Sequence, residues 1–94
     1  MAILGFADKE TARVFAGDFS RRLPIDIQLI AKRKMMYMDA VDSLDDLRVP
    51  PANHLEKLHG DRAGQYSIRI NKQYRICFTV LAAGFDDVEI IDYH

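Results

Sequence analysis

The sequence has a single cysteine and no long hydrophobic run. Because Cys77 has no partner cysteine, an intrachain disulfide and a zinc site made of cysteines are excluded. No apolar stretch approaches the roughly 20 residues of a membrane-spanning helix. Residues 1–10 also lack a basic region followed by a long apolar segment. We therefore expect an untargeted cytoplasmic protein that makes no membrane contact.

The chain also lacks a strong charge of either sign, since 13 basic and 14 acidic residues leave a net charge of -1. Bulk positive charge is thereby excluded as the means of holding a nucleic acid. Charge is nevertheless unevenly distributed: residues 54–75 carry five basic and two acidic side chains, whereas residues 76–94 carry four acidic and no basic ones. This asymmetry predicts a local anion site and not a broad basic surface.

The composition is that of a soluble globular protein, with 49% hydrophobic and 29% charged residues. No repeat, low-complexity tract or linker divides the chain. A chain of this length rarely buries two separate cores. We expect one domain that spans residues 1–94.

Apolar periodicity predicts two helices in the N-terminal half. Residues 3–6 are suited to a short first strand, and Asp8 is the expected N-cap of a helix over residues 9–17. Pro24 suits a first helical turn, and apolar residues then recur mostly at three- and four-residue steps as far as Val41. The second of these helices is expected to be the longer.

Strands are predicted in the C-terminal half. Two consecutive prolines in residues 47–54 are expected to end helical structure and to force an extended connection. Alternating apolar residues then predict strands at residues 66–70 and 74–80, and residues 87–94 form a third candidate. The predicted fold class is α+β, with two N-terminal helices packed on one face of a small, mainly antiparallel β-sheet.

The alternation also fixes the register of the predicted hairpin. If the apolar residues of both strands share the core face, the hairpin is centred on Lys72 and pairs Ile70 with Tyr74. Arg69 then lies directly opposite Arg75, whereas a slip by one residue would place apolar and charged side chains on the same face. We therefore expect Arg69 and Arg75 to be cross-strand neighbours.

Two facing arginines call for a compensating anion, because like charges across a strand pair cost roughly 0.2 to 1 kcal/mol. One possibility is a carboxylate of the last strand, Asp92 or Glu89, or simply solvent. The other is a ligand phosphate, which guanidinium groups bind bidentately. The residue pattern leaves both open.

Known cofactor and metal motifs are missing from the sequence. His54, His59 and Asp92 are candidate metal ligands, but the five-residue separation of the histidines matches no compact metal motif, and nearby cations would repel a metal ion. No phosphate-binding glycine loop, dinucleotide fingerprint or serine-histidine-acid order occurs. We expect neither a metal nor a cofactor.

The run LEKLHGDRAGQYSIRINKQYRICF, followed by VEIIDYH, resembles the HigB toxins of bacterial type II toxin-antitoxin systems, within the RelE-like superfamily. The resemblance covers essentially the whole chain. It implies a RelE-like fold and a ribosome-dependent endoribonuclease that cleaves mRNA in the ribosomal A site without a metal and inhibits translation. The implied partners are mRNA, the ribosome and a HigA-like helix-turn-helix antitoxin, through which alone the toxin would contact operon DNA.

The resemblance also implies roles for individual residues. Arg75 would stabilise charge on the pentavalent phosphate, Tyr93 and His94 would orient or protonate the reacting oxygens, and Asp92 would hold the end of the chain in place. The RNA-binding set is Arg69, Arg62, Lys72 and His54.

The general base is left open by the sequence. The residue before the Gly-Asp-Arg run is commonly lysine in these toxins, whereas this chain has His59 there and Lys57 two positions earlier. Histidine can accept a proton near neutral pH but is a weaker electrostatic partner when neutral. His59, Lys57 and Glu56 are therefore all candidates.

Two other functions are compatible with the same fold. A ParE-like relative would inhibit DNA gyrase by binding and would have no nuclease site; such relatives generally lack a tyrosine-histidine ending. A protein-binding module would use its basic strip only for its antitoxin. Tyr93 and His94 favour the nuclease over the ParE-like relative, and a protein-binding module would cause no toxicity when expressed alone.

Overall fold

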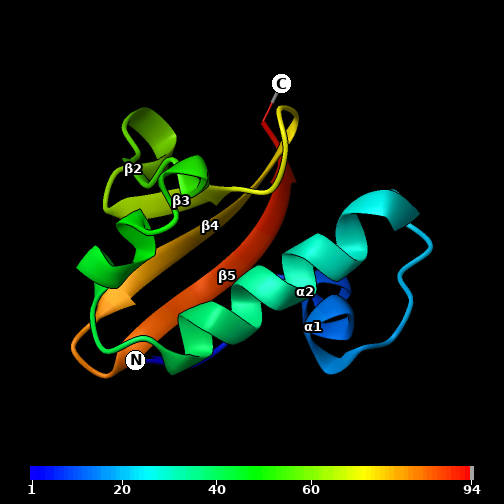
Figure 1. The fold of residues 1–94 in the computed structure, drawn as a ribbon, viewed down its shortest axis with the longest axis horizontal. Helices are drawn as coiled ribbons and strands as arrows, with labels where there is room; N and C mark the ends of the chain where they lie inside the picture. Colours follow the sequence, from blue (N-terminus) through cyan, green and yellow to red (C-terminus); the bar gives the residue numbers. More distant parts are fainter. Residues whose placement is uncertain (94) are drawn as a thin grey trace.

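The computed structural model describes residues 1–93, in which strands and helices form a two-layer α+β arrangement (Figure 1). Within this part, five strands form one sheet in the order β1-β5-β4-β3-β2. Only the β1–β5 pair is parallel; the other three neighbouring pairs are antiparallel. The strands are β1 (Ala2–Ile3), β2 (Glu56–Lys57), β3 (Gln65–Arg69), β4 (Tyr74–Leu81) and β5 (Gly84–Asp92).

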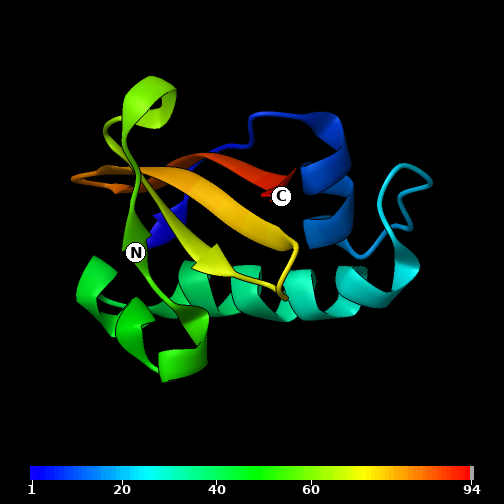
Figure 2. The ribbon, with the colours of Figure 1, turned by 90° about the horizontal axis from the view of Figure 1, so that it is seen from above.

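Two α-helices pack with this sheet, and the predicted fold class is confirmed. Helix α2 (Ile25–Ala40) lies along one face, and α1 (Lys9–Ala16) packs against α2 and beside β5 (Figure 2). The Thr11 hydroxyl of α1 accepts a hydrogen bond of 3.0 Å from the backbone N–H of Ile90 in β5. No helix in residues 1–93 is both long enough and apolar enough to cross a membrane.

Helix α1 begins where the sequence predicts. The Asp8 carboxylate accepts a hydrogen bond of 3.2 Å from the Thr11 backbone N–H, as an N-cap does. The helix ends at Gly17, whose φ of 91° is left-handed and suits glycine. Helix α2 begins directly after Pro24, and Val41 follows its last residue.

The core lies between α2 and the sheet. On the helix side it contains Ile27, Ala31, Met35 and Met38, all nearly inaccessible. On the sheet side Phe78 of β4 and Phe85 of β5 are fully buried, with ring centroids 4.9 Å apart and an edge-on orientation. Aromatic pairs prefer this geometry.

The prediction of an extended connection over residues 47–54 is wrong. Two 3-10 helices, η1 (Leu44–Arg48) and η2 (Pro51–Asn53), occupy most of the segment. Ser43 and Asp46 cap η1 reciprocally, and Pro51 opens η2 because a proline is tolerated in a first turn. A third 3-10 helix, η3 (Gly60–Arg62), follows β2.

The terminal strands also differ in length from their predicted ranges. Strand β1 ends at Ile3, although Phe6 still bridges to Val88. Strand β5 begins at Gly84, three residues before the predicted start. A Cβ atom at Gly84 would lie 2.0 Å from the Ala2 carbonyl oxygen, so only glycine allows β1 to approach this closely.

Candidate active site at the turn between β3 and β4

The β3–β4 hairpin has the predicted register, with Arg69 paired with Arg75 and Ile68 paired with Ile76. Asn71 builds the turn: its side-chain oxygen accepts hydrogen bonds from the backbone N–H groups of Gln73 at 2.8 Å and Tyr74 at 2.7 Å. Such asparagine contacts stabilise tight turns. The two arginines therefore lie side by side where the hairpin turns.

Arg75 is held in place by neighbours on three sides, and only 8% of the residue is exposed. Its Nε donates to the hydroxyl of Ser67 at 2.7 Å, and its Nη2 donates to the backbone carbonyl of His54 at 2.5 Å. The Glu56 carboxylate lies 3.8 Å from Nη2. This arrangement fixes the guanidinium before any ligand binds.

The Glu56 contact corrects one expectation from the sequence. The carboxylate near Arg75 comes from β2 and not from β5, because β2 pairs with β3 and places Glu56 opposite Ser67. Glu89 instead pairs with Arg62 at 3.2 Å. A single partly exposed carboxylate at 3.8 Å offsets only a small part of the charge of two arginines.

Tyr93 brings the end of β5 to the same place. The Tyr93 ring centroid lies 5.5 Å from the guanidinium carbon of Arg75, within the range of a cation–π contact. The Tyr93 backbone N–H donates to the Gln73 carbonyl at 2.7 Å, and the Gln73 side-chain amide donates to the Asp92 carboxylate at 3.1 Å. These bonds tie the strand end to the hairpin turn. His94 lies outside the described residues.

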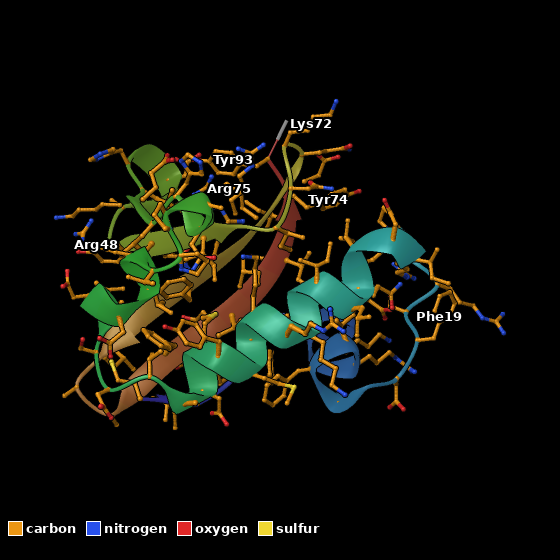
Figure 3. The ribbon with its side chains drawn as sticks, in the orientation of Figure 1. Phe19, Arg48, Lys72, Tyr74, Arg75 and Tyr93 are labelled. Atoms are coloured by element: carbon orange, nitrogen blue, oxygen red, sulfur yellow. The ribbon has the colours of Figure 1, made fainter. Side chains whose placement is uncertain are left out.

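These side chains surround a concave space of about 270 Å³, here named the arginine hollow. Three of its lining residues are cations and one is a carboxylate, so the hollow favours an anion. Figure 3 shows Lys72, Arg75 and Tyr93 gathered at this end of the molecule. The lining residues are His54, Glu56, Arg69, Asn71, Lys72, Arg75 and Tyr93.

Several predicted site residues lie elsewhere. Lys57 pairs with Tyr66, so its side chain points to the opposite sheet face from that of Glu56. His59 is exposed in the segment before η3, and neither residue lines the arginine hollow. Asp92 is exposed and contacts Gln73 beside the hollow.

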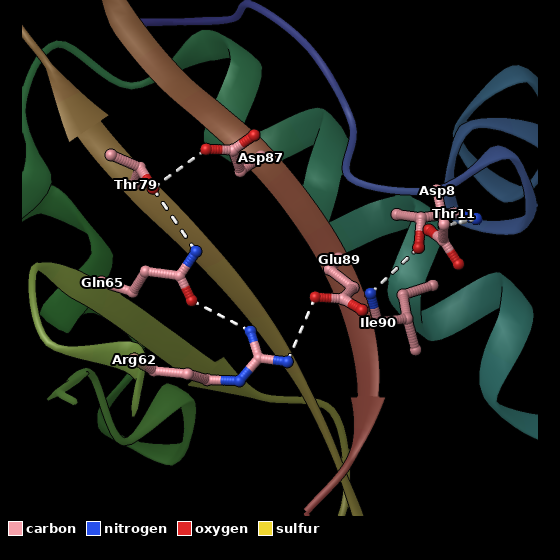
Figure 4. Close-up of polar contacts among 8 residues, drawn as sticks. All are labelled: Asp8, Thr11, Arg62, Gln65, Thr79, Asp87, Glu89 and Ile90. Atoms are coloured by element: carbon pink, nitrogen blue, oxygen red, sulfur yellow. Dashed lines mark hydrogen bonds and ion pairs between the residues drawn. The ribbon is translucent and has the colours of Figure 1, made fainter. Parts of the chain in front are cut away.

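Arg62 belongs to a separate polar group on the sheet. Its two terminal nitrogens donate to Gln65 at 3.0 Å and to Glu89 at 3.2 Å (Figure 4). The Gln65 amide reaches Thr79, whose hydroxyl reaches Asp87, each at 3.4 Å. The Arg62 charge is therefore already engaged by a protein carboxylate.

Ser67 and Asn71 are site residues that the sequence reasoning missed. Ser67 is fully buried although polar, and its hydroxyl accepts the hydrogen bond from Nε that orients Arg75. The sequence did contain a signal for Ser67. The alternation that placed Arg69 on one face of the sheet also placed Ser67 on that face, next to the arginine pair. Asn71 shows a different signal, because asparagine is a common turn residue.

Within residues 1–93, no group of three or more histidine, cysteine or acidic side chains is arranged to hold a metal ion. The arginine hollow itself brings together two guanidinium groups, an ammonium, a carboxylate, an imidazole and a phenol.

Cys77, on the same sheet face as Arg75, is expected to be unreactive in the folded protein. Burial raises the pKa of its thiol from an ordinary 9.0 to about 11. At pH 8 the thiolate fraction then falls about a hundredfold below that of an ordinary thiol. Reaction with an aromatic disulfide reagent should be at least that much slower in native protein than in guanidinium chloride; equal rates would contradict the burial.

The same pKa has a stability consequence. Because the folded pKa lies above the unfolded one, the neutral thiol stabilises the fold below the unfolded pKa. That contribution is lost as pH rises from about 9 to about 11. Cys77→Ala should remove this part of the alkaline decline in the free energy of unfolding.

The chain is similar to known proteins over most of its length. A family model described as the RelE-like toxin of the type II toxin-antitoxin system HigB matches residues 4–94. Toxin HigB-1 of Vibrio cholerae serotype O1 is 42% identical over 76 residues, which are 80% of this chain and 80% of that toxin. An uncharacterized protein of Haemophilus influenzae is 42% identical over 62 residues, covering 66% of this chain and 61% of the relative.

Proposed function

We propose that this chain, which belongs to the HigB-like family of RelE-like type II toxins, is a ribosome-dependent endoribonuclease that cleaves mRNA in the ribosomal A site. The observation that carries the proposal is the arginine hollow, in which a preorganised Arg75 lies beside Arg69, Lys72, Glu56 and Tyr93. A preorganised cation is suited to the charge that develops on a phosphate during cleavage.

The proposed reaction is an internal transesterification. The ribose 2'-oxygen attacks the adjacent phosphorus while its proton passes to a base. The bond from phosphorus to the 5'-oxygen breaks, and that oxygen takes a proton from an acid, leaving a 2',3'-cyclic phosphate and a free 5'-hydroxyl. Arg75 would stabilise the additional negative charge on the pentavalent phosphate, and no step requires a metal.

We assign the base role to Glu56. Of the three candidates, Glu56 lines the arginine hollow, whereas Lys57 points to the other sheet face and His59 lies outside the lining. A base must lie within reach of the proton that it removes, so position favours Glu56 among the three. Tyr93, whose ring lines the hollow, and His94 keep the implied role of orienting or protonating the oxygens.

The remaining cations are assigned to RNA binding with unequal weight. Arg69 and Lys72 line the hollow and would hold phosphates that flank the cleaved bond, and His54 also lines it. Arg62, engaged by Glu89, would contribute least. The net charge of -1 fits a nuclease whose substrate is positioned by the ribosome, and such a nuclease would act in the cytoplasm.

The function is tested by incubating purified protein with ribosomes programmed with a defined mRNA and mapping the new 5' ends. Cleavage within the A-site codon is expected only when ribosomes are present. A parallel DNA gyrase supercoiling assay separates the ParE-like alternative, since inhibited supercoiling with intact mRNA would overturn the proposal. A HigA-like antitoxin should suppress the cleavage, and operon DNA should bind only the toxin-antitoxin complex.

Glu56→Gln is expected to slow cleavage on programmed ribosomes by about a hundredfold, because the amide cannot accept the 2'-hydroxyl proton. Lys57→Gln is the matched control, since Lys57 is the next residue of β2 on the opposite face, and it should change the rate less than about threefold. Single-turnover rates measure the chemical step directly. A Glu56→Gln rate equal to that of Lys57→Gln would remove Glu56 from the mechanism.

A further inference from the structure

Helix α2 has apolar side chains on two opposite sides. One side, with Ile27, Ala31 and Met38, is buried in the core. The other carries Ile25, Leu29 and Met36, which are 72%, 56% and 54% exposed. Their spacings of four and seven residues place these three on one stripe. A small domain gains nothing in water from an outer stripe of this kind, which is typical of a surface covered by a partner.

The stripe continues into a hollow between α2 and the loop after α1. This hollow has a volume of about 300 Å³, and Phe19 of the loop, 56% exposed, contributes to its wall together with Ile25 and Leu29. Gln28 fixes the loop, because its amide donates to the carbonyls of Ser20 at 2.7 Å and Leu23 at 3.0 Å. The hollow is thus preformed. We name Phe19, Ile25, Leu29 and Met36 the outer α2 surface.

The surroundings of the outer α2 surface are cationic. Residues 13–33 contain five basic and two acidic side chains, a net charge of +3 in a chain whose total is -1. A neighbouring hollow of about 290 Å³ shares Phe19 and is lined by four cations and one carboxylate. The cations are Lys9, Arg13, Arg21 and Arg22. An apolar stripe beside such a rim complements an amphipathic helix whose flanks are acidic.

We infer that the outer α2 surface is the docking site of the antitoxin, which would place an acidic amphipathic helix along α2. The inference rests on the proposed function only in taking the partner to be the antitoxin of a type II toxin. Figure 3 shows Phe19 well apart from Arg75 and Tyr93. The antitoxin would therefore hold the toxin without entering the arginine hollow.

The test is calorimetric titration of the purified toxin with a candidate HigA-like antitoxin, chosen because it suppresses the toxicity of this chain. The variant Ile25→Asp/Leu29→Asp should weaken binding by about a hundredfold, since it removes two apolar anchors and adds charges of the same sign as the partner's. Both positions are exposed, so the fold should persist in a thermal melt. The control Leu81→Asp changes an exposed leucine of β4 and should leave the affinity within about threefold.

A charge-reversal pair tests the acidic character of the partner. Arg21→Glu/Arg22→Glu should slow association about tenfold and reduce its dependence on salt. Arg48→Glu reverses an exposed arginine at the other side of the molecule (Figure 3) and should change neither quantity. A loss of affinity without any change in salt dependence would contradict the inference that the helix of the partner is acidic.

Other occupants give distinct results. Unchanged antitoxin affinity in Ile25→Asp/Leu29→Asp overturns the inference. If the same variant then no longer sediments with phosphatidylglycerol vesicles, the surface binds membranes. If it instead loses a dimer that the free toxin forms, the surface binds a second copy of this chain. Failure of the nuclease proposal is read separately, because the titration needs no cleavage. The variant should also cleave mRNA at the wild-type rate while resisting neutralisation by the antitoxin.

Discussion

Arg75→Ala is expected to reduce single-turnover cleavage of mRNA on programmed ribosomes by about a thousandfold, close to the upper range for one lost charge-stabilising group. The guanidinium is held by Ser67 and by the His54 carbonyl, so it requires no reorganisation when charge develops on the phosphate. Arg75→Lys should recover little of this rate, because an ammonium cannot keep both contacts and still face the hollow.

Arg69→Ala is the matched control for this prediction. Arg69 is the direct cross-strand partner of Arg75 and lines the same hollow. Unlike the guanidinium of Arg75, that of Arg69 is not fixed by hydrogen bonds to neighbouring strands within residues 1–93. It should lose about tenfold, mainly in KM, as a phosphate-binding residue does. Equal losses at the two positions, or more than a tenth of the wild-type rate in Arg75→Ala, would show that Arg75 has no special role. Thermal melts exclude unfolding as the cause.

The largest effect on stability is expected from Phe78→Ala, at about 3 to 5 kcal/mol. Phe78 is fully buried and packs edge-on against Phe85, so truncation loses apolar burial, leaves a cavity and removes an aromatic pair. For a domain of this size each kcal/mol lowers Tm by about 4 to 8 °C.

Leu81→Ala is the control on the same strand. Leu81 is 45% exposed, so its truncation should cost about 0.5 kcal/mol or less. Urea denaturation at constant pH measures both free energies of unfolding. A loss below about 1 kcal/mol in Phe78→Ala would mean that the sheet and α2 are not joined by this core.

Local pattern was enough to predict the hairpin and the helix starts. In strands β3 and β4, alternation of apolar and polar residues allowed only one register, and this register brought Arg69 beside Arg75. Asp8 was recognisable as an N-cap because the side chain acts within one helical turn. Each of these features depends on residues close together in the sequence.

The surroundings of Arg75 were not predictable in this way. Strand β2 has only two residues, too few to show a period, so its pairing with β3 and the position of Glu56 left no trace in the alternation. The His54 carbonyl reaches Arg75 from a residue with a φ of 45°, a backbone geometry that no side-chain pattern encodes. The groups that surround Arg75 are therefore set by contacts between residues far apart in the sequence, which the local pattern does not contain.

Periodicity also gave an incomplete account of α2. Apolar steps from Ile27 to Met38 indicated most of the core stripe, but they also counted Ile30, which is 40% exposed. The sequence did not reveal that Ile25, Leu29 and Met36 form a separate, exposed stripe. Apolar residues occur both in cores and on surfaces, so their identity alone does not show which stripe is buried. Only burial in the folded chain distinguishes the two.

The contact between Thr11 and Ile90 affects how this protein behaves at high concentration. Residues 2–7 pair with β5 only as far as Val88, so beyond Val88 the border of the sheet would offer the backbone groups of Ile90 to another molecule. Helix α1 lies along this border, and the Thr11 hydroxyl occupies the Ile90 N–H. A hydroxyl thus takes the place of a neighbouring strand at Ile90, and we expect it to disfavour the pairing of this edge with a strand of another molecule.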